Sequence, residues 1–141
     1  MNDKSKKVIL NLDKKNSINK RIAIFESDEE YELQFLMDEI PFFKDIVVFH
    51  HMIYEGCLKR FLEDLTLVKE DSKIIEYAVL KISVINDSIE LNIYKTKEDY
   101  RIEISLEKEY EGSTQISIRN YSLSNEEFEQ FYSNLKNLVN V

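Results

Sequence analysis

Apolar and polar residues alternate along the second half of the chain with the period of a β-strand. Between Tyr77 and Tyr121, four stretches place apolar residues at every second position, which predicts strands with one buried and one exposed face. These apolar residues are Ala78, Leu80, Ile82, Val84, Ile89, Leu91, Ile93, Tyr100, Ile102, Ile104, Leu106, Ile116 and Ile118. Short polar segments at 86–88, 96–99 and 111–113 predict the turns between them. The pattern therefore predicts an antiparallel meander.

The period changes to that of a helix after the meander. Ser124 and Glu127 have the spacing of a capping box, and Leu123 and Phe128 are placed to form a hydrophobic staple around it. The apolar residues that follow share one helical stripe: Phe128, Phe131, Tyr132, Leu135, Leu138 and Val139. We therefore expect a closing helix that starts at this cap and covers the apolar face of the sheet.

The first half of the chain predicts further strands and a first helix. Alternation predicts strands at 8–12, 22–26, 31–37 and 45–54, with turns at 13–20 and 27–30 and an interruption at Pro41. The strand at 45–54 is apolar on both faces, which favours a central strand or one that is covered on both sides. The helical spacing of Leu58, Phe61, Leu62 and Leu65 predicts a helix at about 55–68.

These elements define the expected fold class. We predict an α+β fold in which a mainly antiparallel β-sheet, built around the meander, carries two amphipathic helices packed on one face. A length of 141 residues fits a single domain over 1–141, with the polar residues 1–7 disordered. Apolar runs are too short for a membrane span or a signal peptide, and one cysteine allows no intrachain disulfide. We therefore expect a cytoplasmic protein that does not enter a membrane.

Charge is distributed unevenly along the chain. The formal net charge is −8, but residues 1–21 carry +5, so residues 22–141 carry −13. A body this acidic repels phosphate backbones, which argues against nucleic-acid binding and favours either plain solubility or a surface that attracts a basic protein. The carboxylates that we assign to partner binding from charge density are Asp28, Glu29, Glu30, Glu32, Glu107, Glu109, Glu111 and Glu126.

Few residues in the sequence are suited to catalysis or to cofactor binding. Gly56 and Gly112 are the only glycines, so no glycine-rich phosphate loop, dinucleotide fingerprint or nucleophile elbow can form. His50 and His51 are adjacent in a predicted strand and point to opposite faces, which favours one ring in the core and one at the surface over a metal site. For Cys57 we favour a small buried hydrophobe over a catalytic thiol. We expect no metal, no cofactor and no enzymatic activity.

From about residue 31 onward the order of elements resembles the WapI-like immunity proteins of bacterial polymorphic toxin systems. The resemblance covers about 31–141 and rests on three features. These are the Leu58, Phe61, Leu62 and Leu65 run after a strand, the meander from Tyr77 to Tyr121, and the helix from Leu123 to Leu138. The resemblance is one of pattern, and the family has no catalytic residues that could be assigned to positions in this sequence. It implies a non-enzymatic immunity protein (an antitoxin) that binds and neutralises a cognate toxin, which is a basic protein in one version of the hypothesis.

Two other classes of function stay open from the sequence. One is an acidic protein-binding module of another kind, such as a phage-encoded inhibitor or an assembly adaptor. The other is an enzyme or small-ligand binder with a cleft between helices and sheet, which a pocket lined by Cys57, a histidine and a carboxylate would favour. The gene neighbourhood separates the first two hypotheses, because an immunity gene lies beside its toxin gene.

Overall fold

The computed structural model of the chain describes residues 7–12, 20–39, 44–71, 75–109 and 113–140. These residues form eight strands and two helices. By its internal contacts the chain divides into two compact units, residues 1–55 with 133–141 and residues 56–132, and each is described by itself. The single domain that we expect from the chain length stays a prediction.

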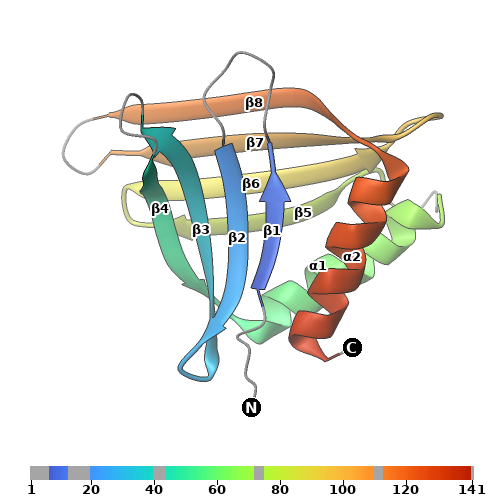
Figure 1. Cartoon of the computed structure of the whole chain (residues 1–141), viewed down its shortest axis with the longest axis horizontal. Helices are drawn as coiled ribbons and strands as arrows, with labels where there is room; N and C mark the ends of the chain where they lie inside the picture. The colour runs from blue at the N-terminus through green and yellow to red at the C-terminus, as the bar shows by residue number, and fades with distance from the viewer. Residues whose placement is uncertain (1–6, 13–19, 40–43, 72–74, 110–112, 141) are drawn as a thin grey trace. The chain divides into compact units, whose positions relative to one another are not determined.

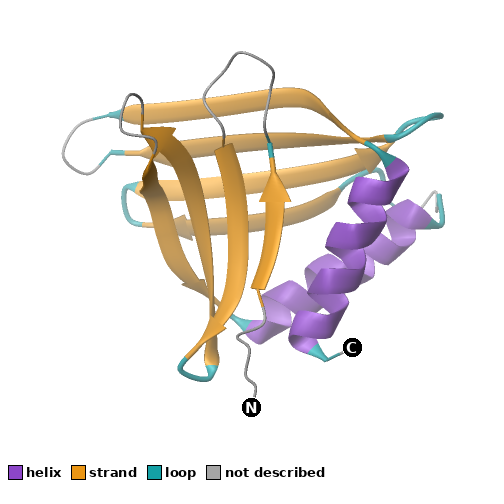
Figure 2. Cartoon of the chain, in the orientation of Figure 1, coloured by secondary structure: helices purple, strands orange, loops and turns teal. Residues whose placement is uncertain are grey.

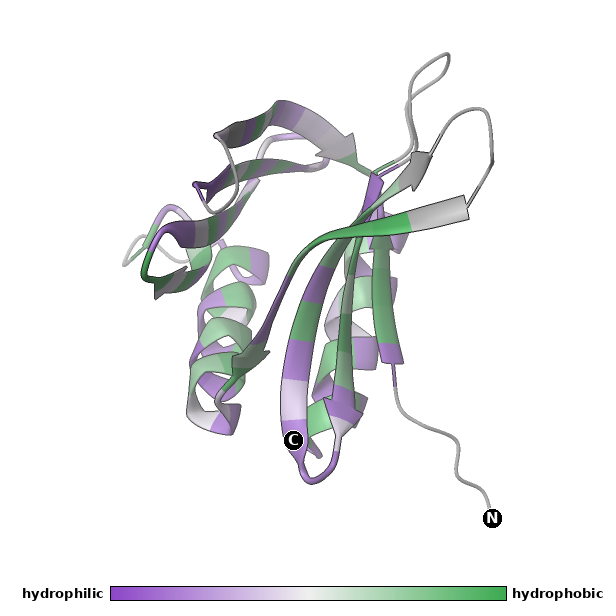
Figure 3. Ribbon diagram, turned by 90° about the vertical axis from the view of Figure 1, so that its left-hand side faces the viewer, coloured by the Kyte–Doolittle hydropathy of each residue, from purple (hydrophilic) through white to green (hydrophobic). Residues whose placement is uncertain are grey.

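In the unit of residues 56–132, the predicted meander is confirmed. Its strands are β5 (Ala78–Val84), β6 (Asp87–Lys95), β7 (Tyr100–Lys108) and β8 (Thr114–Leu123). They pair in the order β5-β6-β7-β8, with every neighbouring pair antiparallel (Figure 1). Buried and exposed positions alternate along β5 and β7, because alternate side chains point to opposite faces of the sheet. The same alternation appears as bands of hydrophobic and hydrophilic residues along the strands in Figure 3.

The turns of this sheet follow from residues that tolerate tight backbone geometry. The β5–β6 turn consists of Ile85 and Asn86, because Val84 already pairs with Asp87; the predicted turn at 86–88 was one residue too late. Asn86 has a φ of 71°, in the left-handed region that asparagine adopts more readily than most residues. The β6–β7 turn at 96–99 is confirmed, and the amide N of Thr96 donates to the carbonyl O of Asp99 at 2.8 Å.

Helix α1 (Glu55–Lys69) and the first half of α2 (Asn125–Val139) pack on the apolar side of this sheet (Figure 2). Phe61 of α1 meets Phe131 of α2 edge-on, with ring centroids 6.4 Å apart. Phe128 of α2 stacks on Tyr100 of β7 with centroids 3.7 Å apart. Such aromatic pairs add to the burial of their area, so they fix how the two helices lie on the sheet.

The predicted capping box at the start of α2 is confirmed. The amide N of Glu127 donates to Ser124 Oγ at 3.0 Å, and the amide N of Ser124 donates to Glu127 Oε1 at 2.8 Å. Each side chain satisfies a backbone donor that the helix leaves free. Leu123 and Phe128, the predicted staple, are both fully buried.

The unit of residues 1–55 and 133–141 contains a second antiparallel sheet. Its strands are β1 (Lys7–Asn11), β2 (Lys20–Ser27), β3 (Glu30–Glu39) and β4 (Lys44–Ile53), in the order β1-β2-β3-β4. The core rows run across the strands, as in the row of Leu10, Ile22, Phe35 and Phe49, which are all buried. In the same unit the hydroxyl of Tyr31 donates to the carbonyl O of Leu138 at 3.5 Å.

The prediction that β4 is central or covered on both sides is wrong. β4 is the terminal strand of its sheet, and Ile46, Val47 and Met52 are each 40–46% exposed. Its second apolar face is exposed. The prediction failed because the composition of a strand shows that a face is apolar but not whether another element covers it. A register shift between Phe35 and Leu36 accompanies this pairing and marks a β-bulge.

The expected α+β class with mainly antiparallel strands is confirmed, and the strands form two four-stranded sheets. Helix α1 begins as predicted and ends one residue later, at Lys69. The prediction that residues 1–7 are disordered is wrong for Lys7, which begins β1 and pairs with Phe25. Several predictions lie outside the described residues: the state of residues 1–6, most of the turn at 13–20, the break at Pro41, and Glu111 and Gly112 in the third turn of the meander.

Candidate functional site

The acidic turn between β2 and β3 is a two-residue hairpin loop in an unusual conformation. Ser27 pairs with Glu30, which leaves Asp28 and Glu29 as the loop, with φ values of 51° and 70°. Two positive φ angles are typical of a type I′ turn, which matches the twist of the flanking strands and prefers Asn-Gly or Asp-Gly. Asp28, Glu29 and Glu30 are all exposed. The loop therefore places adjacent carboxylates at the tip of a hairpin.

Apolar side chains lie beside these carboxylates. Met52 of β4 pairs with Glu32 of β3 and is 46% exposed, and Tyr54, just after β4, is 76% exposed. Two shallow cavities of about 150 and 200 Å³ adjoin the turn, and Met52, Glu30 and Tyr31 line both. We call Asp28, Glu29, Glu30, Glu32, Met52 and Tyr54 the hairpin surface. Exposed methionine and tyrosine beside charged residues are typical of protein-binding surfaces.

Glu32 is the carboxylate of this surface that has partners within the fold. His50 Nδ1 lies 3.4 Å from Glu32 Oε2, and the side-chain amide of Gln34 donates to the same oxygen at 3.3 Å. His50 is exposed on the same face of the sheet, as its pairing with Gln34 requires. Asp28, Glu29 and Glu30 therefore form the more accessible part of the acidic group.

The other predicted partner-binding carboxylates lie in the unit of residues 56–132, at two separate places. Glu107 lies near the end of β7 and Glu109 just after it, whereas Glu126 lies in the first turn of α2, next to the start of β7. Seven residues of extended strand put about 23 Å between these ends. Glu126 also lies at the positive end of the helix dipole, which accounts for an acidic residue there without any need for a partner protein. Glu111 lies outside the described residues.

Glu107 and Glu109 have one exposed apolar neighbour. The amide N of Glu109 donates to the carbonyl O of Asn86 at 2.8 Å, which places Glu109 beside the β5–β6 turn. Ile85 in that turn is 89% exposed. This second acidic group thus offers two described carboxylates and one exposed apolar side chain. The hairpin surface offers four carboxylates and two such side chains, Met52 and Tyr54.

The histidines and the cysteine are the residues that the sequence offers for a metal site or a catalytic thiol. His50 and His51 face opposite sides of β4 as predicted, but His51 is only partly covered and its Nδ1 lies 2.8 Å from the carbonyl O of Met52. Cys57 is exposed, so its expected burial is wrong: it falls outside the buried stripe that starts at Leu58. Neither Cys57 nor a histidine lines any of four cavities found among the described residues. No group of three potential metal ligands occurs within these residues either.

Asp99 in the β6–β7 turn has the most strongly perturbed carboxyl group for which a value is resolved. Ser122 Oγ donates to its Oδ2 at 2.6 Å, Thr96 Oγ1 to its Oδ1 at 2.7 Å and Arg101 Nε to its Oδ1 at 3.1 Å. Hydrogen bonds from Ser122, Thr96 and Arg101 lower the pKa of Asp99 to about 2. All of these donors serve the turn and the neighbouring strands, so Asp99 is a structural anion with no acid–base role at neutral pH.

Charge density in the sequence pointed to the hairpin turn but missed the apolar half of its surface. Met52 falls in the strand that the pattern assigned to a covered position, and Tyr54 was counted within that same strand. One signal for Tyr54 was available in the sequence: it ends the apolar run just before the first helix. An aromatic residue at the end of a strand can remain exposed.

Comparison of the chain with known protein families, curated proteins and solved structures found no match. Within the described residues, no helix is long and apolar enough to cross a membrane. The case for a function therefore rests on the residues and their geometry.

Proposed function

We propose that this protein binds a basic protein through the hairpin surface and acts as an immunity protein that neutralises a cognate bacterial toxin. The protein acts by occupying its partner, in the cytoplasm and without a cofactor. The resemblance in the order of elements supports the immunity role, and the geometry of the hairpin surface supports protein binding. A basic toxin domain such as a nuclease would meet there the negative charge that it otherwise meets on phosphates.

The observation that carries the proposal is the conformation of Glu29. Six non-glycine residues in the described part of the chain have positive φ: Asp28, Glu29, Asp71, Asn86, Asn120 and Asn140. Five are Asn or Asp, which tolerate this region, and Glu29 is the exception. A longer acid there costs roughly 1 kcal/mol relative to a residue suited to the turn. Within the described part of the chain, no hydrogen bond or ion pair engages the exposed Glu29 side chain, so its charge at this tip is best explained by binding.

Three features support this surface over the other acidic groups. It combines adjacent carboxylates with exposed Met52 and Tyr54, so it can supply both electrostatic steering and an apolar contact area. Two concave regions flank the turn and can receive partner side chains. The acids at the start of α2 are accounted for by the helix dipole.

The first experiment identifies the partner. Tagged protein is purified from its native host, and bound proteins are identified by mass spectrometry. We expect a basic protein, encoded directly upstream, whose toxicity is relieved when this chain is expressed with it. Capture of phage structural proteins, with no relief of toxicity, would favour the alternative of an acidic inhibitor or adaptor.

The second experiment locates the binding surface. Asp28→Lys with Glu30→Lys should slow association with the captured partner about tenfold or more at low salt, because the acids steer encounter, and the slowing should shrink as salt rises. The matched control is Glu107→Lys with Glu109→Lys, which makes the same charge change at the second acidic group. If the control pair slows association and the hairpin pair does not, the binding surface lies beside Ile85. Equal association rates for all variants at low salt would contradict electrostatic steering.

A further inference from the structure

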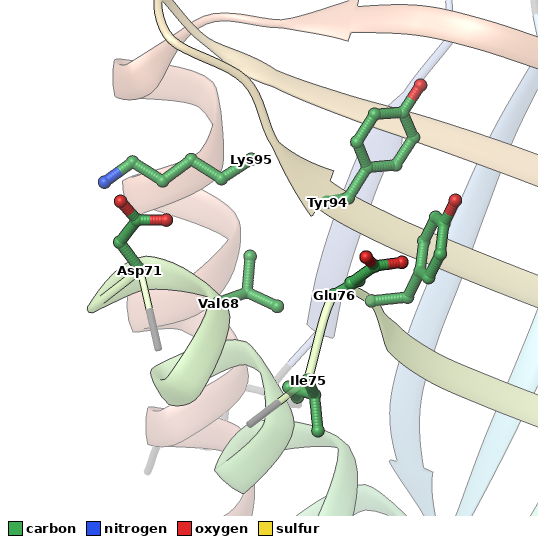
Figure 4. Close-up of a pocket in the computed structure, with 7 residues that line it drawn as sticks. Val68, Asp71, Ile75, Glu76, Tyr94 and Lys95 are labelled. Carbon is green, nitrogen blue, oxygen red and sulfur yellow. The ribbon is translucent and has the colours of Figure 1, made fainter. Parts of the chain in front are cut away.

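A cavity lies in the unit of residues 56–132, where α1 ends and β5 begins. It has a volume of about 520 Å³ and is lined by Val68, Asp71, Ile75, Glu76, Tyr77, Tyr94 and Lys95 (Figure 4). This volume falls in the range of sites that bind a side chain or a small molecule. The sequence left open a cleft between helices and sheet lined by Cys57 and a histidine, but neither residue type lines this cavity.

Two tyrosine rings form the aromatic wall of this cavity. Tyr77 precedes β5 and Tyr94 belongs to β6, and their centroids lie 5.2 Å apart with the planes at 73°. The hydroxyl of Tyr94 donates to Asn120 Oδ1 at 3.3 Å, which holds this ring in place. Such an edge-to-face pair leaves a ring face available, and the face of an aromatic ring attracts cations.

Two carboxylates line the cavity, Glu76 on the side of the tyrosine rings and Asp71 on the opposite side (Figure 4). Within the described residues, no hydrogen bond or ion pair engages the carboxylate of Asp71 or Glu76, in contrast to Asp99 with its three donors. In Figure 4, Val68 lies between Asp71 and Glu76. The last carbonyl groups of α1 add partial negative charge at the same end.

The lysines near the cavity are already engaged. Lys95 Nζ donates to the carbonyl O of Lys69 at 3.3 Å, so it caps the end of α1. Lys69 Nζ donates to Glu129 Oε1 at 3.0 Å, and this hydrogen bond raises the pKa of Lys69. Both ammonium groups keep their positive charge, and the side chain of Lys95, which lines the cavity, runs towards Asp71 and away from Glu76 in Figure 4.

We propose that this cavity binds a guanidinium group and, on the strength of the proposed function, takes an arginine side chain of the partner protein. Glu76 pairs with the guanidinium, one of the two tyrosine rings stacks against its plane while the other, at 73° to the first, meets its edge, and Val68 and Ile75 contact the methylene stem. Arginine fits this set better than lysine because its planar fork both stacks on aromatic rings and bonds carboxylates in pairs.

The test titrates the intact protein with N-acetyl-arginine amide and follows it by NMR. The neutral isostere N-acetyl-citrulline amide is the control ligand. We expect saturable shifts confined to the residues that line the cavity, with the citrulline compound binding at least about tenfold more weakly. Equal binding of both compounds, or shifts spread over all acidic residues without saturation, would overturn the proposal. Tighter binding of N-acetyl-lysine amide would overturn the choice of arginine.

Two variants and a matched control connect the shifts to named residues. Glu76→Gln and Tyr94→Leu should each weaken binding of the arginine compound by about threefold to tenfold. Glu90→Gln removes a carboxylate from β6, outside the cavity, and should leave binding unchanged. Far-UV circular dichroism shows whether each variant folds, and Glu76 is exposed, so its change leaves packing intact.

The results also separate this proposal from the proposed function. If the captured partner binds the Glu76→Gln variant as tightly as the unaltered protein, the cavity does not take a partner arginine, and the hairpin surface stands alone. If no protein is captured but arginine amide saturates the cavity, the guanidinium site stands and the immunity role falls.

Discussion

The two sheets of this protein treat their turns and exposed faces differently. In the β5–β8 sheet, the left-handed positions fall on Asn86 and Asn120, which suit them, and the Asp99 carboxylate is fully engaged by donors. In the β1–β4 sheet, a left-handed position falls on Glu29, while Met52 and Val47 are exposed on the terminal strand. The first sheet follows local folding rules closely, and the second departs from them where carboxylates and apolar side chains meet. Departures of this kind are expected where a surface serves binding more than stability.

The largest expected effect concerns the core of the unit of residues 56–132. Phe131 is 2% exposed and packs edge-on against Phe61, so Phe131→Ala leaves a cavity and should cost about 3–5 kcal/mol of unfolding free energy. The measurement is urea unfolding followed by circular dichroism.

Ser124→Ala is the comparison variant for Phe131. It removes one capping hydrogen bond at an exposed helix start, so it should cost only about 1 kcal/mol. If the two variants unfold at the same urea concentration, or Ser124→Ala at the lower one, the aromatic packing of the helices does not dominate the stability of this unit.

The next effect appears only in acid. Hydrogen bonds hold the pKa of Asp99 at about 2, below its ordinary value of 3.8, so the folded state binds the proton less readily than the unfolded chain. The stability that Asp99 contributes is therefore fully present above about pH 4 and is lost as the pH falls towards 2. Asp99→Asn should lower stability at pH 7 and flatten the part of the stability–pH curve between pH 4 and 2.

Urea midpoints measured from pH 2 to 7 check the Asp99 prediction. Glu98→Gln is a matched control, because it removes the neighbouring carboxylate of the same turn but none of the hydrogen bonds to Asp99. A curve for Asp99→Asn that is as steep in acid as that of the unaltered protein would show that other carboxylates control acid unfolding.

The same contrast explains how much of the fold could be predicted from sequence. The alternation at Ala78, Leu80 and Ile82 and the capping pair Ser124 and Glu127 are local signals, and both sheet and helix start follow from them. The strands form two sheets because β4, before α1, and β5, after it, do not pair with each other. No local sequence pattern reports whether two strands on either side of a helix pair. The apolar run at Val47 and Phe49 is compatible with a central strand and with an exposed terminal one.

The candidate sites were predictable in part for similar reasons. Charge density found Asp28 and Glu30 because carboxylates are visible in sequence, whereas the left-handed φ of Glu29 appears only once the hairpin register is known. The cavity with Tyr77 and Tyr94 forms from cross-strand neighbours 17 positions apart in the chain, beside the end of a helix. Such sites depend on register, which one sequence leaves open.

A smaller effect tests the strain at the acidic hairpin directly. Glu29→Gly creates the Asp-Gly loop that type I′ turns prefer, so it should raise unfolding free energy by about 0.5–1 kcal/mol and weaken partner binding. Asn86→Glu makes the converse change in the β5–β6 turn and should lower stability by about 1 kcal/mol. If Glu29→Gly is destabilising, the glutamate is favourable in its loop and the argument from strain is wrong.

The smallest expected effect concerns Cys57 and the histidines, and it tests whether either unit carries hidden chemistry. Cys57 is exposed on α1, so it should react with dithionitrobenzoate in the folded protein nearly as fast as in the urea-unfolded chain. Cys57→Ser, His50→Gln and His51→Gln should each change unfolding free energy by no more than about 0.5 kcal/mol and leave partner neutralisation intact. The thiol is exposed, His51 contacts the carbonyl O of the neighbouring Met52, and the contact of His50 with Glu32 lies at the surface. Loss of activity in a Cys57→Ser protein that keeps its circular dichroism spectrum would return the catalytic thiol to consideration, and with it the class of enzymes.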